Sequence, residues 1–350
     1  MRVLVTGSTG FVGSHLCEYA LKQGADVWGV RRWRSSMENV EHLRNRVHFI
    51  NGDLTDPSAV RKILEESKPD WIFHLAAQSF VKCSFEQPRE TLHTNIMCEI
   101  NLLHGLREKL AGAMVVAGSS EEYGKVLTTE IPIKENHPLR PLSPYAVSKV
   151  AQDLLAYQYH QSYGVHVVRA RAFNHEGPRR DEVFVTSSFA KQIAEIELGL
   201  KEPVVHVGNL AAIRDFTDVR DTVRAYWLLL EKGDPGDVYN IASAEADGLW
   251  KFNPDVAQGE CLYGAWKISD VLDYLGQIST HHHFRIETDP ARMRPSDVPI
   301  LVGDFTKLLN KTGWQPTIPF KRTLEDMLIY WRERIRRNME VPGAPLGVLR

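Results

Sequence analysis

The sequence has little cysteine, almost no net charge and no long apolar run. Its 350 residues include four cysteines, Cys17, Cys83, Cys98 and Cys261, and none is paired at a spacing typical of a metal site. Scattered cysteines and the lack of a charged-then-apolar leader before the first apolar run favour a cytoplasmic protein without a bound metal. No apolar stretch reaches the about 18 residues that a membrane-spanning helix needs, so we expect no membrane insertion.

The charges nearly cancel, with 42 basic against 44 acidic side chains and a formal net charge of -2. A nucleic-acid-binding surface usually shows a strong basic excess, so no nucleic-acid partner is expected and any phosphate site must be local. The chain is otherwise ordinary, with 43% apolar residues. At this length folding should bury about 75% of the surface, so the core needs no disulfide or metal to stabilise it.

Short apolar runs bounded by turn residues recur through the first 180 residues, and stretches long enough for a helix separate most of them. Largely apolar strands of this kind are typical of a parallel sheet that is covered on both faces. We therefore predict an α/β fold with a Rossmann-type doubly wound parallel sheet. The expected strands are Val3–Thr6, Val27–Val30, Val47–Asn51, Trp71–Leu75, Met114–Ala117 and Val165–Arg171.

The rhythm changes after Pro178, where the pattern predicts helices over Ser187–Leu200 and Asp218–Glu231. We predict an NADP-binding Rossmann domain over residues 1–175, to which segments at about 210–240 return, and a smaller mixed substrate-binding lobe over 176–350. Residues 245–264 are interpreted as an insertion with no assigned role. Residues 281–283 are adjacent histidines, which point in different directions on a loop and so indicate a solvated face.

A glycine-rich segment follows the first expected strand and precedes the helical pattern Ser14–Gln23. Glycine permits a tight turn, close approach of backbone N–H groups to a pyrophosphate, and near contact of helix and strand. The pattern favours a dinucleotide site over a glycine-rich turn without a ligand. The candidate cofactor-binding residues here are Gly7, Gly10, Phe11, Val12 and Gly13.

Basic residues stand at the end of the second expected strand, where a NAD-specific site would usually place an acidic residue. Arg31 and Arg32 suit a ribose 2′-phosphate through charge-assisted bonds, which favours NADP over NAD. A solvated basic loop is the alternative. Residues after the third and fourth strands complete the predicted cofactor groove: Asp53 and Leu54 toward the adenine, and Leu75, Ala76 and Ala77 along the groove.

A third segment predicts proton-transfer chemistry. Ser143-Pro144 opens an expected helix in which Tyr145 and Lys149 are four residues apart and therefore share a face. A lysine ammonium beside a phenol lowers the pKa of the phenol, so Tyr145 becomes a candidate base. The pair alone is a weak signal, but it follows Ser119 at the end of an expected buried strand and a nucleotide-binding motif.

Together these segments resemble the extended short-chain dehydrogenase/reductase family across nearly the whole chain. The resemblance is strongest to GDP-mannose 4,6-dehydratases. It is carried by four separate segments, namely residues 78–86, 118–124, 173–180 and 208–210, with the sequences QSFVKCSFE, GSSEEYG, FNHEGPRR and GNL.

The resemblance implies a lyase that recycles NADP on GDP-mannose. It implies that Tyr145 and Lys149 also bind the cofactor, that Tyr145 takes the proton of the sugar 4-hydroxyl while hydride passes from C4 to NADP, and that Ser119 binds the C4 oxygen. Glu121 would then remove the C5 proton, water would leave C6, and the hydride would return there. A structural carboxylate is the alternative for Glu121, and a structural or solvated one is expected for Glu122.

The resemblance also implies a substrate grip and further cofactor contacts. Arg214 and Arg294 match positions near the substrate pyrophosphate, and His175 and Arg180 match cofactor contacts. The remaining substrate-facing candidates are Ser79, Val81, Asn174 and Asn209. We expect the arginines at positions 31, 32, 180, 214 and 294 to converge on one cleft.

Some segments depart from the dehydratase pattern. Residues 184–193 and 294–302 look closer to reductases that convert GDP-4-keto-6-deoxy-mannose to GDP-rhamnose, and these can share the run at residues 119–124. Dehydratase is favoured mainly by Arg179-Arg180 and Arg31-Arg32. A reductase, an epimerase and a non-enzymatic NADP-sensing protein stay open as alternatives. Relatives imply a homodimer or homotetramer, for which residues 31–46 are a candidate subunit contact.

Overall fold

A computed structural model describes residues 1–243, 264–293 and 298–340 of the chain. Its largest sheet has seven strands in the order β10-β6-β5-β4-β1-β2-β3, and every adjacent pair is parallel. The order reverses between β1 and β4, the switch point at which such sheets bind ligands. The predicted Rossmann-type sheet is confirmed. Its strands are β1 (Arg2–Thr6), β2 (Asp26–Arg31), β3 (His48–Asn51), β4 (Trp71–His74), β5 (Ala113–Ala117), β6 (His166–Ala172) and β10 (Val238–Ile241).

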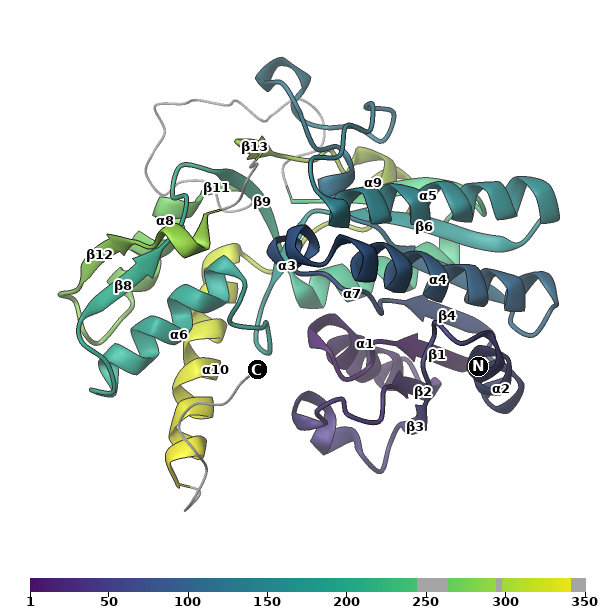
Figure 1. The fold of residues 1–350 in the computed structure, drawn as a ribbon, viewed down its shortest axis with the longest axis horizontal. Coiled ribbons are helices and arrows are strands. Elements are labelled where there is room, and N and C mark those ends of the chain that lie inside the picture. The colour runs from purple at the N-terminus through teal and green to yellow at the C-terminus, as the bar shows by residue number, and fades with distance from the viewer. Residues whose placement is uncertain (244–263, 294–297, 341–350) are drawn as a thin grey trace.

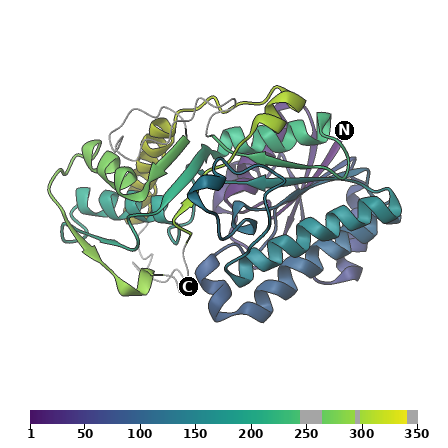
Figure 2. The same cartoon turned by 90° about the horizontal axis from the view of Figure 1, so that it is seen from above.

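Helices cover both faces of this sheet (Figure 2). Alternate residues of β1 point to opposite sides, so Val3 and Val5 belong to one apolar core while Leu4 belongs to another. Helices α1 (Phe11–Lys22) and α7 (Val219–Lys232) supply the first core, and α2 (Pro57–Ser67), α4 (Pro88–Arg107) and α5 (Pro144–Tyr163) supply the second.

A smaller lobe lies beside the carboxyl ends of the strands (Figure 1). Strand β9 pairs with β7 and β13 in parallel and with β11 in antiparallel fashion, while β8 and β12 form a separate parallel pair. Three helices pack around this lobe's own apolar core. Its elements are β7 (Asn174–Glu176), α6 (Val185–Glu197), β8 (Val204–Val207), β9 (Ile213–Asp218), β11 (Gly264–Lys267), α8 (Ile268–Gln277), β12 (Arg285–Thr288), β13 (Ile300–Leu301) and α10 (Phe320–Glu340).

The chain passes more than once between the lobe and the large sheet. After β9, helix α7 packs on the sheet and β10 extends it, and α9 (Thr306–Thr312) adds Leu308 to the same core. The domain division at residue 175 stays a prediction. Residues 245–263 of the proposed insertion at 245–264 lie outside the described part of the chain.

Several expected element boundaries differ from those in the structure. Helix α1 begins at Phe11 rather than Ser14, because Gly10 takes the N-cap position with extended backbone and needs no side-chain cap. The helix expected over Ser187–Leu200 is α6, which begins at Val185 and ends at Glu197. None of the helices in the described ranges is long and apolar enough to cross a bilayer.

Candidate functional site

The turn after β1 is shaped for close backbone packing. Gly7 has a φ of +65°, and a Cβ on Gly13 would lie 2.2 Å from the Gly7 carbonyl oxygen. Only glycine at position 13 lets the first turn of α1 press against this loop. No acidic residue lies in the first turn of α1, so its N-terminus presents free N–H groups and a favourable dipole to an anion. The glycine turn therefore fits a dinucleotide pyrophosphate.

The turn after β4 is held against the turn after β1 by Thr6. Its Oγ1 accepts hydrogen bonds of 3.0 Å from both the Leu75 and Ala76 backbone N–H groups. Because both lone pairs are used, the Thr6 hydroxyl donates to His74 Nδ1, also at 3.0 Å. Burial lowers the pKa of His74 to about 3 and keeps the ring neutral. The predicted groove formed by the segment Leu75–Ala77 thus lies directly beside Gly7.

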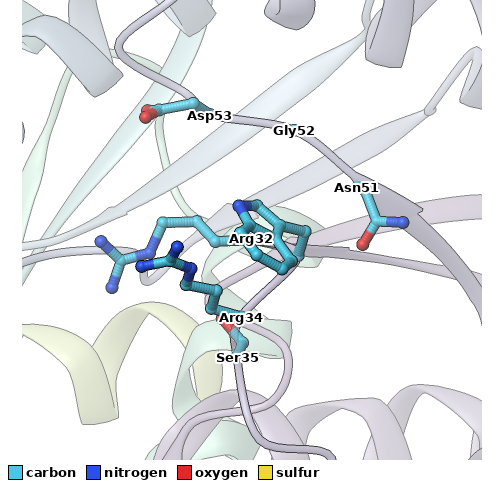
Figure 3. A pocket seen from close by; sticks show the side chains of 7 residues that line it. Arg32, Arg34, Ser35, Asn51, Gly52 and Asp53 are labelled. Carbon is cyan, nitrogen blue, oxygen red and sulfur yellow. The ribbon is translucent and has the colours of Figure 1, made fainter.

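A cavity of about 530 Å³ opens where β2 and β3 end. Figure 3 shows the Arg32 and Arg34 side chains together on one side and Asn51, Gly52 and Asp53 on a separate segment. Two Thr55 hydrogen bonds and the charge of Arg32 lower the pKa of Asp53, so its carboxylate is ionised.

Basic side chains, and a backbone held in place just after β3, make this cavity suitable for a phosphorylated ribose. Arg31 Nε is buried and has no hydrogen-bond partner within the described part of the chain, and the Arg34 guanidinium lies 4.5 Å from the centre of the Trp33 ring. The backbone of Leu54 is fixed by the Asn101 amide, which donates to its carbonyl at 2.8 Å.

The helix that carries the predicted base forms as expected. Ser143 is the N-cap of α5, with its side chain accepting a 3.1 Å hydrogen bond from Ala146 N–H, and Pro144 occupies the first helical position. Tyr145 and Lys149 share the face toward the sheet, and the Lys149 ammonium lies 5.9 Å from the centre of the Tyr145 ring. Lys149 Nζ donates to the Ala117 carbonyl at the end of β5, at 2.7 Å.

The protonation of Tyr145 differs from the expectation. Burial raises its pKa, and Glu121 and Glu122 add to the rise, while the Ser119 hydrogen bond and the Arg180 charge oppose it. The spacing alone suggested that Lys149 would lower the pKa of the phenol. The physical reason for the difference is desolvation, which also lowers the pKa of Lys149.

The two adjacent glutamates after β5 have different environments. Glu122 is fully buried: its Oε1 accepts a 2.7 Å hydrogen bond from Ser119 N–H, and its Oε2 lies 3.1 Å from Arg171 Nε. It is therefore structural, and not solvated. Glu121 is only partly buried, and its charge raises the pKa of Tyr145, so its carboxylate is within electrostatic range of the phenol.

The start of α1 and the loop after β7 meet around Phe11. The His175 ring stacks on Phe11 with centroids 6.1 Å apart, and the Arg180 guanidinium lies 5.1 Å from Phe11 and 3.5 Å from Phe184. Burial, with the charge of Arg180, lowers the pKa of His175 to about 4. Both predicted cofactor contacts, His175 and Arg180, thus lie beside the start of α1, and Arg180 is also within electrostatic range of Tyr145.

The adjacent side chains of Arg179 and Arg180 point toward different partners. Arg179, at a φ of +75°, turns back to Glu18 and Ser14 on α1, at 2.6 and 3.2 Å. Arg180 instead points into the site and pairs with buried Glu176 at 3.4 Å.

The predicted substrate residues are more dispersed. Ser79 is exposed after β4, Val81 is buried at the start of α3 (Val81–Glu86), and Asn174 lies on β7. Asn209 is exposed and accepts a hydrogen bond from Ala211 N–H, and Arg214 is buried on β9, where it donates to the Ile213 carbonyl. Arg294 lies outside the described residues, so the convergence of five arginines stays a prediction.

Sequence reasoning missed a set of buried polar residues behind the site. Thr6, Glu99, Asp153 and Arg171 are each at most 5% exposed. Phe184, which covers Arg180, was expected only as part of a lobe segment. The sequence offered one signal for these residues, namely polar side chains along α4 and α5. Hydrophobic periodicity assigns such polar positions to the solvent-facing side of a helix, so their burial was not predicted. No group of three or more His, Cys, Asp or Glu able to hold a metal occurs within residues 1–243, 264–293 and 298–340.

Comparison with known proteins agrees with this geometry. A family model described as GDP-mannose 4,6 dehydratase matches residues 4–327. The chain belongs to this family. It is 34% identical to GDP-mannose 4,6-dehydratase of Yersinia enterocolitica, with 93% of this chain and 92% of that protein covered.

Other relatives of this dehydratase-family chain include a reductase. GDP-6-deoxy-D-mannose reductase of Pseudomonas aeruginosa is 34% identical, covering 96% of this chain and 99% of that protein. The solved structure of RMD from Pseudomonas aeruginosa complexed with NADPH has a TM-score of 0.77 and 30% identity, covering 95% of this chain and all of that one.

Proposed function

We propose that the protein is a GDP-mannose 4,6-dehydratase that converts GDP-D-mannose to GDP-4-keto-6-deoxy-D-mannose with bound NADP. The observation that carries the proposal is the meeting of Tyr145, Ser119 and Glu121 beside Ala117, at the end of β5 and next to the glycine turn. Membership of the dehydratase family supports the choice of sugar nucleotide.

In this reaction Tyr145 handles the proton of the sugar 4-hydroxyl. Tyr145 reacts as the phenolate, after its own proton has passed to solvent; its Oη then accepts the 4-hydroxyl proton, and the Ser119 hydroxyl, which hydrogen-bonds Tyr145, orients the same sugar oxygen. NADP, held by the glycine turn, would supply the acceptor for the C4 hydride and the donor of that hydride to C6. The Lys149 ammonium, fixed by Ala117, stabilises the phenolate against the burial that raises the pKa of Tyr145.

Glu121 makes the difference between a lyase and a simple oxidoreductase. A 4-keto group acidifies the sugar C5–H, and the partly buried Glu121 carboxylate on the Tyr145 side removes that proton so that water can leave from C6. Glu122 cannot take this role because Ser119 N–H and Arg171 occupy its oxygens.

The cofactor is NADP, held by the glycine turn and by the basic end of β2. Arg32 and Arg34 line the cavity and Arg31 precedes them at the end of β2, so the cavity has positive charge that suits a 2′-phosphate. The relative structure complexed with NADPH supports this choice. Binding of NADP and NAD to the purified protein tests it, and a clear preference for NAD would contradict it.

One incubation tests the reaction itself. The purified protein is loaded with NADP, freed of excess cofactor and given GDP-mannose without reductant. We expect the 4-keto-6-deoxy nucleotide sugar to form, with no net change in the reduced cofactor. No turnover of GDP-mannose would reject the proposal.

A reductase is the second candidate, favoured by the 34% identical GDP-6-deoxy-D-mannose reductase. The same assay separates the two functions when it is repeated with the 4-keto sugar and NADPH. Stoichiometric loss of NADPH on the keto sugar, without turnover of GDP-mannose, would assign the reductase.

A homodimer or homotetramer in the cytoplasm completes the proposal. Val147, Leu154 and Tyr157 are 45%, 53% and 45% exposed on α5, and such an apolar face supports self-association. Light scattering measures the oligomer, and a monomer at assay concentration would reject it. Cell fractionation tests the compartment.

A further inference from the structure

A fully buried carboxyl lies behind Lys149. Glu99 is on α4, which packs along α5, and its side chain has no exposed surface. Among the residues that the structure describes, neither Glu99 oxygen makes a hydrogen bond of normal geometry. Burial raises the pKa of Glu99 well above its usual range, and the charge of Lys149 is the main factor that lowers it. Glu99 is therefore ionised only with a compensating cation beside it.

The neighbouring charges leave Lys149 as that cation. Asp153 is paired with two arginines, with Arg169 at 2.6 Å and Arg171 at 2.9 Å. Arg171 is also the ion-pair partner of Glu122. In this cluster of three carboxyls and three cations, Lys149 is therefore left with Glu99, and Glu99 is the largest electrostatic factor that favours its ammonium form.

Other groups facing the pair do not replace Glu99. Helix α5 contributes Gln152 and Asp153, and β4 contributes His74, which burial keeps neutral. Cys98 on α4 stays a thiol because burial raises its pKa. The charged side chains of α2 are exposed, as is Glu86 on α3, while Lys82 donates to the Ala291 carbonyl.

We propose that Glu99 is a positioning residue for the reaction: it is the buried counter-charge that keeps Lys149 protonated, so that the ammonium can stabilise the Tyr145 phenolate that acts as the base. The proposal rests on the proposed function, because it acts through the Tyr145–Lys149 pair. Glu99 is fully buried on α4, so it acts on the reaction through Lys149 and not by direct contact with substrate. Its contribution is the charge state of Lys149 across the working pH range.

The pH profile of kcat/KM tests this role. The Glu99→Gln variant keeps the shape of the side chain and loses the charge, so the alkaline limb, which reports loss of the Lys149 proton, should move to lower pH. A shift of about one pH unit lowers kcat/KM about tenfold on the alkaline side. The Glu99→Asp variant should restore most of the limb.

A matched control removes another buried carboxyl. Glu135 accepts a 2.8 Å hydrogen bond from Asn240 N–H, away from Lys149, and its pKa is also raised by burial. The Glu135→Gln variant should leave both limbs in place, even if it unfolds at a lower temperature. The proposal would be overturned if Glu99→Gln lowered kcat/KM equally at every pH and left the alkaline limb at its original pH.

Infrared spectroscopy tests the pair without turnover. Removing the ammonium with Lys149→Met should leave Glu99 protonated and add a buried carboxylic-acid band that is absent from the Lys149→Met/Glu99→Gln double variant. The same spectrum in both variants would overturn the proposal. This readout holds whether or not Glu99→Gln turns over GDP-mannose, so a failed dehydratase assay and a failed role for Glu99 are distinguished.

Discussion

At the scale of the residue, neighbouring side chains of one type take separate roles because the backbone turns between them. Glu122 is fixed by Ser119 N–H and Arg171, while Glu121 is only partly buried and its charge acts on Tyr145. The catalytic assignment therefore depends on the short 3-10 helix η2 (Ser120–Glu122), which separates two identical residues.

The Glu121→Gln variant should abolish the reaction. The amide keeps the size of the side chain but cannot remove the C5 proton, so both product formation and exchange of C5–H with solvent should stop. Mass spectrometry in deuterated water measures the exchange, and cofactor titration should give unchanged binding. Normal turnover by this variant would refute the role of Glu121.

Replacing Thr6 should loosen the cofactor groove. The Thr6→Val variant leaves the Leu75 and Ala76 N–H groups without their acceptor, which should cost about 1–3 kcal/mol of unfolding free energy and weaken NADP binding. Urea unfolding and cofactor titration measure the two effects. Thr94→Val is the matched control, because the Thr94 hydroxyl donates to Glu90 at the surface of α4. Equal losses in both variants would contradict this prediction.

At the scale of the element, helix starts with local signals were predicted and buried polar faces were not. Ser143-Pro144 before α5 is a local capping signal, and the expected start at Tyr145 lies within one residue of the structure. The burial of Glu99 depends on where α4 meets α5 and the sheet, and no local pattern encodes that meeting. The cofactor turn was predictable for the same reason as α5, since glycines report backbone geometry directly.

The close packing of α1 against the glycine turn predicts how adding one methyl group at position 13 changes NADP affinity. In Gly13→Ala the Cβ would meet the Gly7 backbone oxygen at 2.2 Å, so α1 must shift and NADP affinity should fall by at least tenfold. Gly105→Ala on α4 is the control, since its Cβ meets only the movable end of the Leu64 side chain. Calorimetric titration measures both, and equal affinities would reject this account of the turn.

At the scale of the whole molecule, buried neutral histidines link stability to pH. Burial lowers the pKa of His15 and His175 to about 4 and that of His74 to about 3, whereas the unfolded value is near 6.5. The unfolded chain therefore binds more protons as the pH falls, so the contribution present above pH 6.5 is lost on descending to about pH 4.

The His15→Gln variant should show a shallower loss of stability in this range. The variant lacks one group whose pKa differs between the folded and unfolded states. The unfolding free energy of the variant should therefore fall less between pH 6.5 and 4 than that of the unchanged protein. Urea unfolding at several pH values measures the slopes. His282→Gln, on the exposed loop after α8, should leave the slope unchanged, and parallel slopes for all three proteins would contradict the linkage.

The chain order of the large sheet has a consequence for synthesis. Strand β10 pairs with β6, but α6, β8 and β9 of the lobe lie between them in the sequence, and α9 follows later still. While the ribosome makes the lobe, the nascent sheet ends at β6 with an open edge. A folding chain must therefore keep that edge unpaired until residues 238–241 emerge, which makes this interval the period of greatest exposure to misassembly and chaperone binding.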